Sequence, residues 1–416
     1  MSKHARDRRP YIKPVTKLEL SETNIKLRWI AICVLLAIAV VAIGYGFHSA
    51  LSTEPGWQEV TGLTDEVNCG SDFRLMYDFS AGSGNPTTLH KKLETLYGQL
   101  TESAFRMFSP DVEGTDNLYH LNVHVNETVT VAEPLYLALE QIVQAGSRYP
   151  FLAPVTELYE PVFLSSGDAE AVLYDPMHDG ARGSLAAEIA AYCSSPDMIW
   201  IELLGDHSLR LNVAEEYLAY ARENGIETFL DLGWMTNAFI IDYMADALTA
   251  EGFSHGYLAS YDGFTRNFYG SGKGFSQNIY HCVDNTVYLP GVLEYFGPMS
   301  LVSLRSYPMS ELDRWHYYAY ADGSITSVYL NPANGIPQPC IDGITAYSRE
   351  STCSEMVLRL APVFTADSFD AYALEILADE GIESIRCHEK GIVCTDVVQP
   401  VKITDSSYDL VYSSVE

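Results

Sequence analysis

The sequence predicts an α+β fold. Three observations support it: some stretches repeat apolar residues at helical spacing, other short apolar stretches are bounded by turn residues, and the two kinds are mixed without strict alternation. The chain has 416 residues, 47% hydrophobic and 19% charged. Such a composition is typical of globular protein, and the length allows one large domain or two. We find no internal repeat and no long low-complexity segment.

The elements begin with a short apolar strand over 73–79, followed by a turn over 82–86. Residues 88–107 predict a helix, because their leucines recur three and four residues apart. A second apolar helix is expected over 135–145, where Glu-Pro precedes it and marks the start of a helix. Residues 164–184 are rich in Gly and Asp, so we expect a loop there.

Glycines mark the ends of the next two helices. A helix over 213–224 closes at Gly225, and one over 238–251 closes at Gly252. Asp322-Gly323 between two apolar stretches is a hairpin signal. The other elements expected are strands at 228–232 and 257–260, a turn at 270–274, hairpin strands at 316–321 and 325–330, helices at 355–363 and 368–380, and a strand pair around Cys387 and Cys394.

A membrane anchor is predicted at the N-terminus. Residues 1–28 form a basic tail with eight Lys or Arg against three Asp or Glu. The nineteen residues from Trp29 to Phe47 carry no charge, and at about 1.5 Å each they nearly span a hydrocarbon core of about 30 Å. We expect a transmembrane helix over 29–48, a stalk over 49–66 and a globular domain over 67–416.

Charge around this segment sets its orientation. Basic residues precede it and almost none directly follow, which places the N-terminus in the cytoplasm and the main domain outside the cell. A cleaved signal peptide is the alternative, but its apolar region is usually shorter, about 7–15 residues. His48 before Ser49-Ala50 also makes a poor cleavage site. The sequence therefore favours a single-pass protein of the cell membrane.

The charge of the chain is strongly negative. The formal net charge is −30, and since residues 1–28 carry +5, the rest carries −35. A field of that sign repels nucleic acid and anionic lipid surfaces, so neither is an expected partner. Solubility or a salty environment also explains an acidic surface.

Seven of the eight cysteines follow the predicted membrane segment, which contains Cys33. Cys387 and Cys394 flank a short turn and could pair across a hairpin, as an oxidising exterior would permit. No CxxC pair occurs, so a thiolate zinc site is not expected. The odd number leaves at least one thiol free or intermolecular.

Common catalytic signatures are absent: the sequence has no GxSxG elbow, no HExxH and no Walker A loop. GSGKG at 270–274 lacks the P-loop spacer and fits a hairpin turn better. His120 and His124 are four residues apart, but they lie beside a strand-like stretch, where that spacing gives no shared helix face. The sequence therefore contains no nucleophile motif that would support the hypothesis of an unrelated extracellular hydrolase.

Four segments, taken together, carry a family resemblance. They read FRMFSPDVEGTDNLYHLN to residue 122, TVAEPLYLALEQIVQAGSRYPFLAPVTELYEPVF over 130–163, FLDLGWMTNAFIIDYMADALTAEGFSHGYLASYDG over 229–263 and TSVYLNPANGIP over 326–337. Their order and spacing resemble the ApbE-type flavin transferases (FAD:protein FMN transferases), over about residues 66–395. The resemblance implies an ApbE-like fold of mixed sheets with packed helices.

The resemblance also implies a reaction. The family binds FAD, uses Mg²⁺ to polarise the pyrophosphate, and moves FMN onto a Thr or Ser hydroxyl of an exported acceptor protein. Such chemistry needs a hard cation held by oxygen ligands. It also needs an acidic residue to orient or deprotonate the incoming hydroxyl.

Family roles carry over to individual residues. Asp242 matches the Asp that closes the "KGyavD" motif, and we take it as the catalytic candidate. Glu355 and the backbone carbonyl of Trp234 fall on metal-binding positions. The residues that match FAD-binding positions are Gly70, Phe108, Asn122, Asp231 and Gly263.

Other family positions are changed. The motif Lys is Asn237, followed by Ala238, and the first Gly of a Gly-Gly pair is Asp262, which would place a carboxylate where a pyrophosphate should approach. Arg359 replaces a metal-binding Thr and cannot be a ligand. The remaining changes put Ala153, Val328 and Asn331 at positions of an Asp, a His and an Asp.

Two hypotheses of different classes follow. One is an active, divergent flavin transferase; the other is a membrane-anchored flavin-binding, ligand-binding or scaffolding domain without catalysis. Several family residues are lost at one inferred site, and these coincident losses favour the second hypothesis for the mechanism. The mechanism depends on the segments around Asp231, Asp262 and Glu355 converging on one cleft shaped for a dinucleotide.

Overall fold

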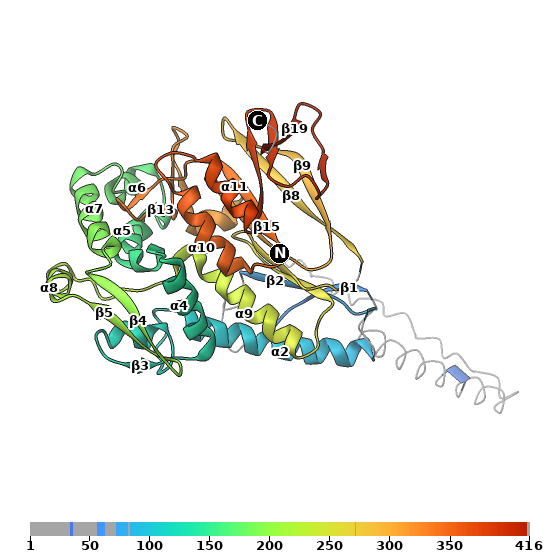
Figure 1. Ribbon diagram of the computed structural model, residues 1–416, viewed down its shortest axis with the longest axis horizontal. Helices are drawn as coiled ribbons and strands as arrows, with labels where there is room; N and C mark the ends of the chain where they lie inside the picture. The colour runs from blue at the N-terminus through green and yellow to red at the C-terminus, as the bar shows by residue number, and fades with distance from the viewer. Residues whose placement is uncertain (1–33, 36–55, 63–71, 82–83, 271, 414–416) are drawn as a thin grey trace, which may run out of the picture. The chain divides into compact units, whose positions relative to one another are not determined.

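The computed structural model describes residues 34–35, 56–62, 72–81, 84–270 and 272–413 (Figure 1). The chain divides into two units, Met1–Thr53 and Glu54–Glu416. The predicted basic tail and almost all of the predicted membrane helix lie outside the described residues. Within the described part of the chain, no helix is long and apolar enough to cross a membrane. Residues 57–60, inside the predicted stalk, form the edge strand of a sheet.

A large mixed sheet organises the second unit. Within the described residues it has nine strands, antiparallel except for the last pair. Across the sheet the strands are β1 (Trp57–Val60), β2 (Phe73–Asp78), β6 (Gly256–Ser260), β7 (Phe264–Asn267), β10 (Met299–Arg305), β15 (Gly343–Ser348), β16 (Glu383–His388), β17 (Gly391–Cys394) and β19 (Asp409–Tyr412).

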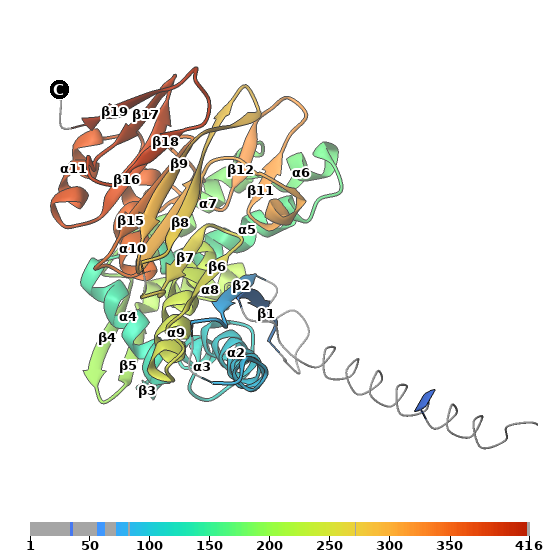
Figure 2. The same cartoon turned by 90° about the vertical axis from the view of Figure 1, so that its right-hand side faces the viewer.

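Helices cover one face of this sheet. α9 (Thr236–Ala250) packs on β6 and β7 (Figure 2), and α10 (Cys353–Phe364) packs on β10 and β15. α2 (Pro86–Phe108) packs against α9, and α11 (Ala371–Asp379) against β16. The helix side holds the main hydrophobic core.

A β-arm lies on the other face. β8 (Gly274–Val283) and β9 (Thr286–Phe296) form a long hairpin, joined by β18 (Val401–Ile403). β8 contacts β15 and β16 (Figure 2). Successive strand residues face opposite sides: in β10, Val302 and Leu304 join the main core, whereas Leu301 joins a second core with residues of the arm.

The segment between β2 and β6 is mostly helical. Its helices are α3 (Leu118–Val123), α4 (Glu133–Ala145), α5 (Ala153–Phe163), α6 (Asp168–Tyr174), α7 (Gly180–Ser194) and α8 (Glu215–Asn224), with the 3₁₀ turns η1 (Tyr149–Leu152) and η2 (Gly233–Met235). A small sheet of β3 (Val129–Thr130), β5 (Ser208–Val213) and β4 (Ile199–Gly205) packs with them. Later short elements are η3 (Glu311–Trp315) and the pairs β11 (Tyr317–Ala319) with β12 (Ile325–Ser327) and β13 (Leu330–Asn331) with β14 (Ile336–Pro337).

Most predicted elements are confirmed, but two are wrong. Residues 164–184 are not a loop, since they hold α6 and the start of α7, whose N-cap Asp179 accepts hydrogen bonds from Ala181 and Arg182. Residues 228–232 form no strand: the amides of Phe229 and Leu230 donate to the Asn122 side chain, and the Asp231 amide donates to the Pro150 carbonyl.

Two local interpretations are also corrected. His120 lies in α3 and His124 is its C-cap, and their ring centroids are 4.3 Å apart, so the four-residue spacing does bring them together on a helix. Cys387 and Cys394 lie on the β16–β17 hairpin but are not opposite each other, because Cys387 pairs with Ile392 and Cys394 with Ile385. Both thiols are free.

Candidate functional site

Asn122 holds the segment that enters the site. Its Nδ2 donates to the Leu230 carbonyl at 2.8 Å, and its Oδ1 accepts from the amides of Phe229 and Leu230 at 3.1 and 2.9 Å. Asn122 is buried, and these bonds replace the pairing that a neighbouring strand would give. The predicted cofactor contact therefore acts on the backbone that leads to Asp231.

A cleft opens where this segment meets the start of α9. It consists of two hollows of roughly 280 and 390 Å³, which share Asp231, Gly233, Trp234 and His316 in their lining. The first reaches the end of α2 and the β6–β7 turn; the second reaches α5 and η3. Asp231 and Asp262 do converge here, but Glu355 does not line either hollow.

The cleft is lined by acidic groups. Asp72, Asp231 and Asp262 line the first hollow, and Glu160 lines the second. Of the described lining residues, none is Lys or Arg, and His316 is the single basic side chain. A pyrophosphate in this cleft would meet carboxylates without a guanidinium or ammonium to balance them.

Asp231 is one of the carboxyls whose pKa is raised. Burial raises its pKa to about 6, and the nearby carboxylates Asp111 and Glu160 add to the rise. Hydrogen bonds from the backbone of Gly233 and Leu232 oppose it. Asp231 therefore exchanges a proton close to neutral pH.

Asp262 lies across the first hollow, on the turn between β6 and β7. Its Oδ2 accepts a hydrogen bond from Asn237 Nδ2 at 2.8 Å. Its Oδ1 is buried and has no hydrogen-bond partner among the described residues. Burial raises the pKa of Asp262, and the nearby His316 opposes the rise. Thus two changed family positions, 237 and 262, bond to each other.

Aromatic side chains give the cleft its flat surfaces. Phe108 lines the first hollow, Trp315 the second, and Trp234 both. The Trp234 ring packs edge-on against Tyr329 and Tyr149, with centroids 4.9 and 6.2 Å away, which fixes its orientation. Such surfaces suit a planar ring system.

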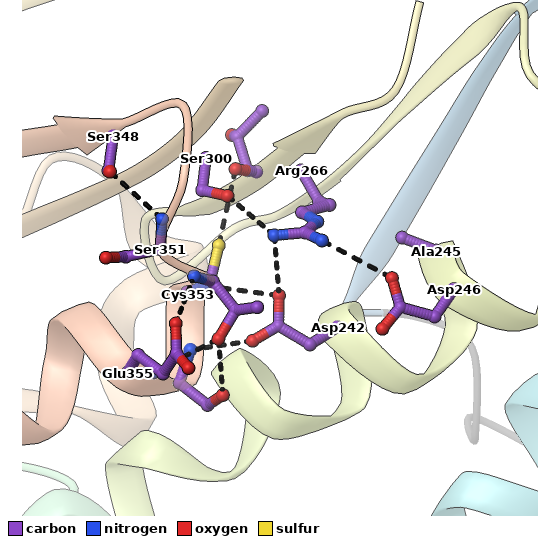
Figure 3. A network of polar contacts seen from close by, with 12 residues as sticks. Asp242, Ala245, Asp246, Arg266, Ser300, Ser348, Ser351, Cys353 and Glu355 are labelled. Carbon is purple, nitrogen blue, oxygen red and sulfur yellow. Dashed lines mark hydrogen bonds and ion pairs between the residues drawn. The ribbon is translucent and has the colours of Figure 1, made fainter. Parts of the chain in front are cut away.

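Asp242 has a structural task at the start of α10 (Figure 3). Its carboxylate accepts hydrogen bonds from the amides of Cys353 and Ser354 at 3.1 and 2.7 Å, and Arg266 lies 3.8 Å away. Burial raises the pKa of Asp242, and Arg266 opposes this. The predicted catalytic carboxylate is buried and does not line the cleft.

Glu355 caps the same helix. Its carboxylate accepts from the Thr352 amide at 2.9 Å, while Thr352 Oγ1 accepts from the Glu355 amide, forming a capping box. Arg359 pairs with Glu380 on the surface. Among the described residues, no group of three or more His, Cys, Asp or Glu side chains could hold a metal ion. With Glu355 in the helix cap and Arg359 in an ion pair, these two positions do not offer the metal ligands that the resemblance implies.

The two predicted glycines are placed differently. Gly70 lies outside the described residues. Gly263 has φ +113°, and a Cβ there would lie 2.2 Å from the Ser303 carbonyl oxygen, so packing alone requires glycine. It lines a separate cavity on the β-arm side rather than the cleft.

Sequence reasoning missed His316 and Trp315. Both lie at the η3–β11 junction, which carries no recognisable motif. A lone His offers no spacing pattern, so only the fold shows that His316 faces Asp262.

Comparisons with known proteins agree on the fold. No protein-family model matches the sequence, and no curated protein matches it. Among solved structures, the ApbE protein of Thermotoga maritima aligns with a TM-score of 0.55 at 13% identity, covering 84% of this chain and 97% of that chain. A mutant of the flavin transferase ApbE from Vibrio cholerae aligns with a TM-score of 0.50 at 13% identity, covering 84% and 98%. The chain therefore has the fold of the ApbE flavin transferases.

Proposed function

We propose that this chain is a flavin-binding protein on the flavin-transferase fold, which binds a flavin ring in the cleft and does not transfer FMN. The observation that carries the proposal is the combination of aromatic surfaces with an acidic lining. Trp234 and Trp315 offer stacking faces, whereas the ring of Phe108 is buried behind the first hollow. Asp231 and Asp262 offer hydrogen-bond acceptors to ring N–H and sugar hydroxyl groups.

The same lining selects against FAD. The pyrophosphate of FAD would approach Asp262 with no Lys or Arg among the described lining residues to offset the repulsion. Riboflavin has the ring and the ribityl hydroxyls but no phosphate. We therefore expect riboflavin to bind more tightly than FMN, and FMN more tightly than FAD.

Loss of catalysis follows from how the family positions are used. Asp242 and Glu355 bond to the backbone at the start of α10. Neither is available to activate a hydroxyl or bind a cation without breaking a helix cap. An active transferase, which the family fold favours, would modify a Thr or Ser of an exported protein with FAD and Mg²⁺ and remains the second candidate.

One experiment separates these functions. The purified full-length chain, kept in detergent, is titrated with riboflavin, FMN and FAD in a calorimeter, with and without Mg²⁺. AMP release is measured with FAD, Mg²⁺ and a Thr-containing acceptor peptide. Riboflavin binding without AMP release supports the proposal; AMP release supports the transferase, and no binding of any flavin overturns both.

Trp234→Ala checks where the flavin binds. Removing this ring should weaken riboflavin binding about tenfold or more, because stacking and burial are lost together. Trp200→Ala is the matched control, since Trp200 is an exposed tryptophan on β4 outside the cleft. If Trp234→Ala and Trp200→Ala weakened riboflavin binding equally, the flavin ring would bind outside the cleft.

The N-terminal segment supports a second proposal, on location. The uncharged run from Trp29 to Phe47 after a basic tail supports a single-pass anchor with the acidic domain outside the cytoplasm. Membranes of cells that make the full chain should retain it through alkaline carbonate washing. External protease should then digest the domain in intact spheroplasts; a protected domain would reverse the orientation.

A further inference from the structure

A second cavity lies on the other face of the sheet. Its volume is roughly 530 Å³, and its walls come from β8 and from β6, β7, β10, β15 and β16 of the large sheet. None of its lining residues lines the flavin cleft. The size falls within the range of small-molecule sites.

The lining of this cavity reverses the charge of the chain. The protein has 55 Asp or Glu against 25 Lys or Arg, yet no described residue lining the cavity is Asp or Glu, and three are arginines: Arg74, Arg305 and Arg386. Hydroxyl and amide side chains, such as Ser303, Thr345 and Gln277, make up much of the rest. This is a surface for a polar, negatively charged molecule rather than for an apolar one.

Tyr307 provides an independent sign of a missing partner. Its side chain lines the cavity and is only 3% exposed, yet its hydroxyl has no hydrogen-bond partner among the described residues. A buried hydroxyl without a partner is costly, and a ligand oxygen in the cavity would satisfy it.

Arg305 lies close enough to Tyr307 to interact with it electrostatically. Arg305 Nη2 donates to Asp313 Oδ1 at 3.2 Å, and the two groups form an ion pair. A guanidinium carries five N–H donors, so this pair does not use all of them. Arg386 stacks over Phe369 at 4.5 Å and forms no ion pair with a described residue.

We infer that this cavity binds a small polyhydroxylated anion, of the class of sugar phosphates and sugar acids. Arg74 is ion-paired with Glu59 and Arg305 with Asp313, so among the described residues Arg386 supplies the unpaired charge for the phosphate or carboxylate. The hydroxyl and amide groups match ring hydroxyls. The inference is independent of the flavin proposal, because the two sites share no lining residue.

The test uses the full-length chain with glucose 6-phosphate, glucuronate, glucose and inorganic phosphate as probes, measured by thermal shift and calorimetry. We expect saturable binding of glucose 6-phosphate or glucuronate, with weaker binding of glucose and phosphate, and a loss of affinity as salt is raised. The anion that binds more tightly shows whether the cavity prefers a phosphate or a carboxylate. No saturable binding of either anion overturns the inference.

Tyr307→Phe makes the test specific. The change removes only the unpartnered hydroxyl, so we expect an unchanged or higher melting temperature and about tenfold weaker binding of the preferred anion. Tyr97→Phe is the matched control, because Tyr97 is also 3% exposed with an unpartnered hydroxyl but does not line the cavity. Equal affinities of wild type and Tyr307→Phe, or displacement of the anion by riboflavin, would overturn the site.

Discussion

Asn237 and Asp262 bond to each other across the first hollow of the cleft, Nδ2 to Oδ2, at 2.8 Å. In the family that the sequence resembles, these two positions hold a Lys and a Gly. Position 237 therefore has a neutral amide in place of a cation, and position 262 has a carboxylate in place of a glycine that leaves the backbone open. Under the proposed function, we expect this exchange to make the cleft discriminate between flavins by their phosphate charge.

Asp262→Asn should change this discrimination. Removal of the carboxylate should raise FAD affinity about tenfold more than riboflavin affinity, because only FAD brings a pyrophosphate toward residue 262. Calorimetric titration of both flavins measures the ratio. Glu294→Gln, an exposed change of the same charge on β9, is the control. An unchanged ratio would mean that Asp262 does not face the phosphates.

Asp231→Asn should stabilise the protein in a pH-dependent way. Burial raises the pKa of Asp231 from 3.8 to about 6. A carboxyl with a raised folded-state pKa contributes stability that is present below the unfolded pKa and lost as pH rises through the folded pKa. Relative to wild type, the variant should gain roughly 1–3 kcal/mol at pH 8 and much less at pH 4.

Urea unfolding at the two pH values measures this gain. Asp197→Asn, at an exposed aspartate in the turn between α7 and β4, should show no comparable pH dependence. If Asp231→Asn were destabilising at pH 8, the carboxylate would be held by a favourable contact rather than strained by burial.

Gly263→Ala should destabilise the fold by at least about 3 kcal/mol, because φ is +113° and the added Cβ would lie 2.2 Å from the Ser303 carbonyl oxygen. Gly381→Ala is the control: φ is +82°, but nothing lies within 4 Å of its Cβ. It should cost only about 1 kcal/mol. Similar losses of melting temperature in both variants would show that the close approach is relieved elsewhere.

Local signals explain what the sequence could predict of the fold. The helix that ends at Gly225 was predictable because a C-cap glycine in the left-handed region follows a periodic segment. α7 is not predictable in this way, because Gly180 and Gly183 lie inside the helix and glycine is more typical of loops. The apolar residues of 228–232 predict a strand, but the sequence does not show whether a neighbouring strand or the Asn122 side chain bonds to their backbone amides.

The site was predictable only in part for a similar reason. Asp231 and Asp262 meet because the family layout brings their segments together. The family resemblance assigns Glu355 to a metal, yet a Thr followed by a Glu three residues later is also the signature of a capping box, and the structure has the capping box. His316 depends on tertiary packing alone.

Asp242 and Glu355 give the last prediction, because helix capping and catalysis predict different outcomes for them. Asp242→Ala removes the acceptor for the Cys353 and Ser354 amides and leaves Arg266 without its buried partner, so we expect a loss of roughly 2–5 kcal/mol. Asp242→Asn keeps one acceptor and should lose less.

Glu355→Gln should cost about 1 kcal/mol or less, since an amide oxygen still accepts from Thr352. Unfolding of all three variants, with riboflavin titrated into the folded protein, checks these values. Because neither residue lines the cleft, riboflavin affinity should stay within about twofold of wild type when the variants are folded. A Mg²⁺-dependent gain in flavin binding that Glu355→Gln abolished would instead assign Glu355 to a metal, and the transferase would then be the better account of this cleft.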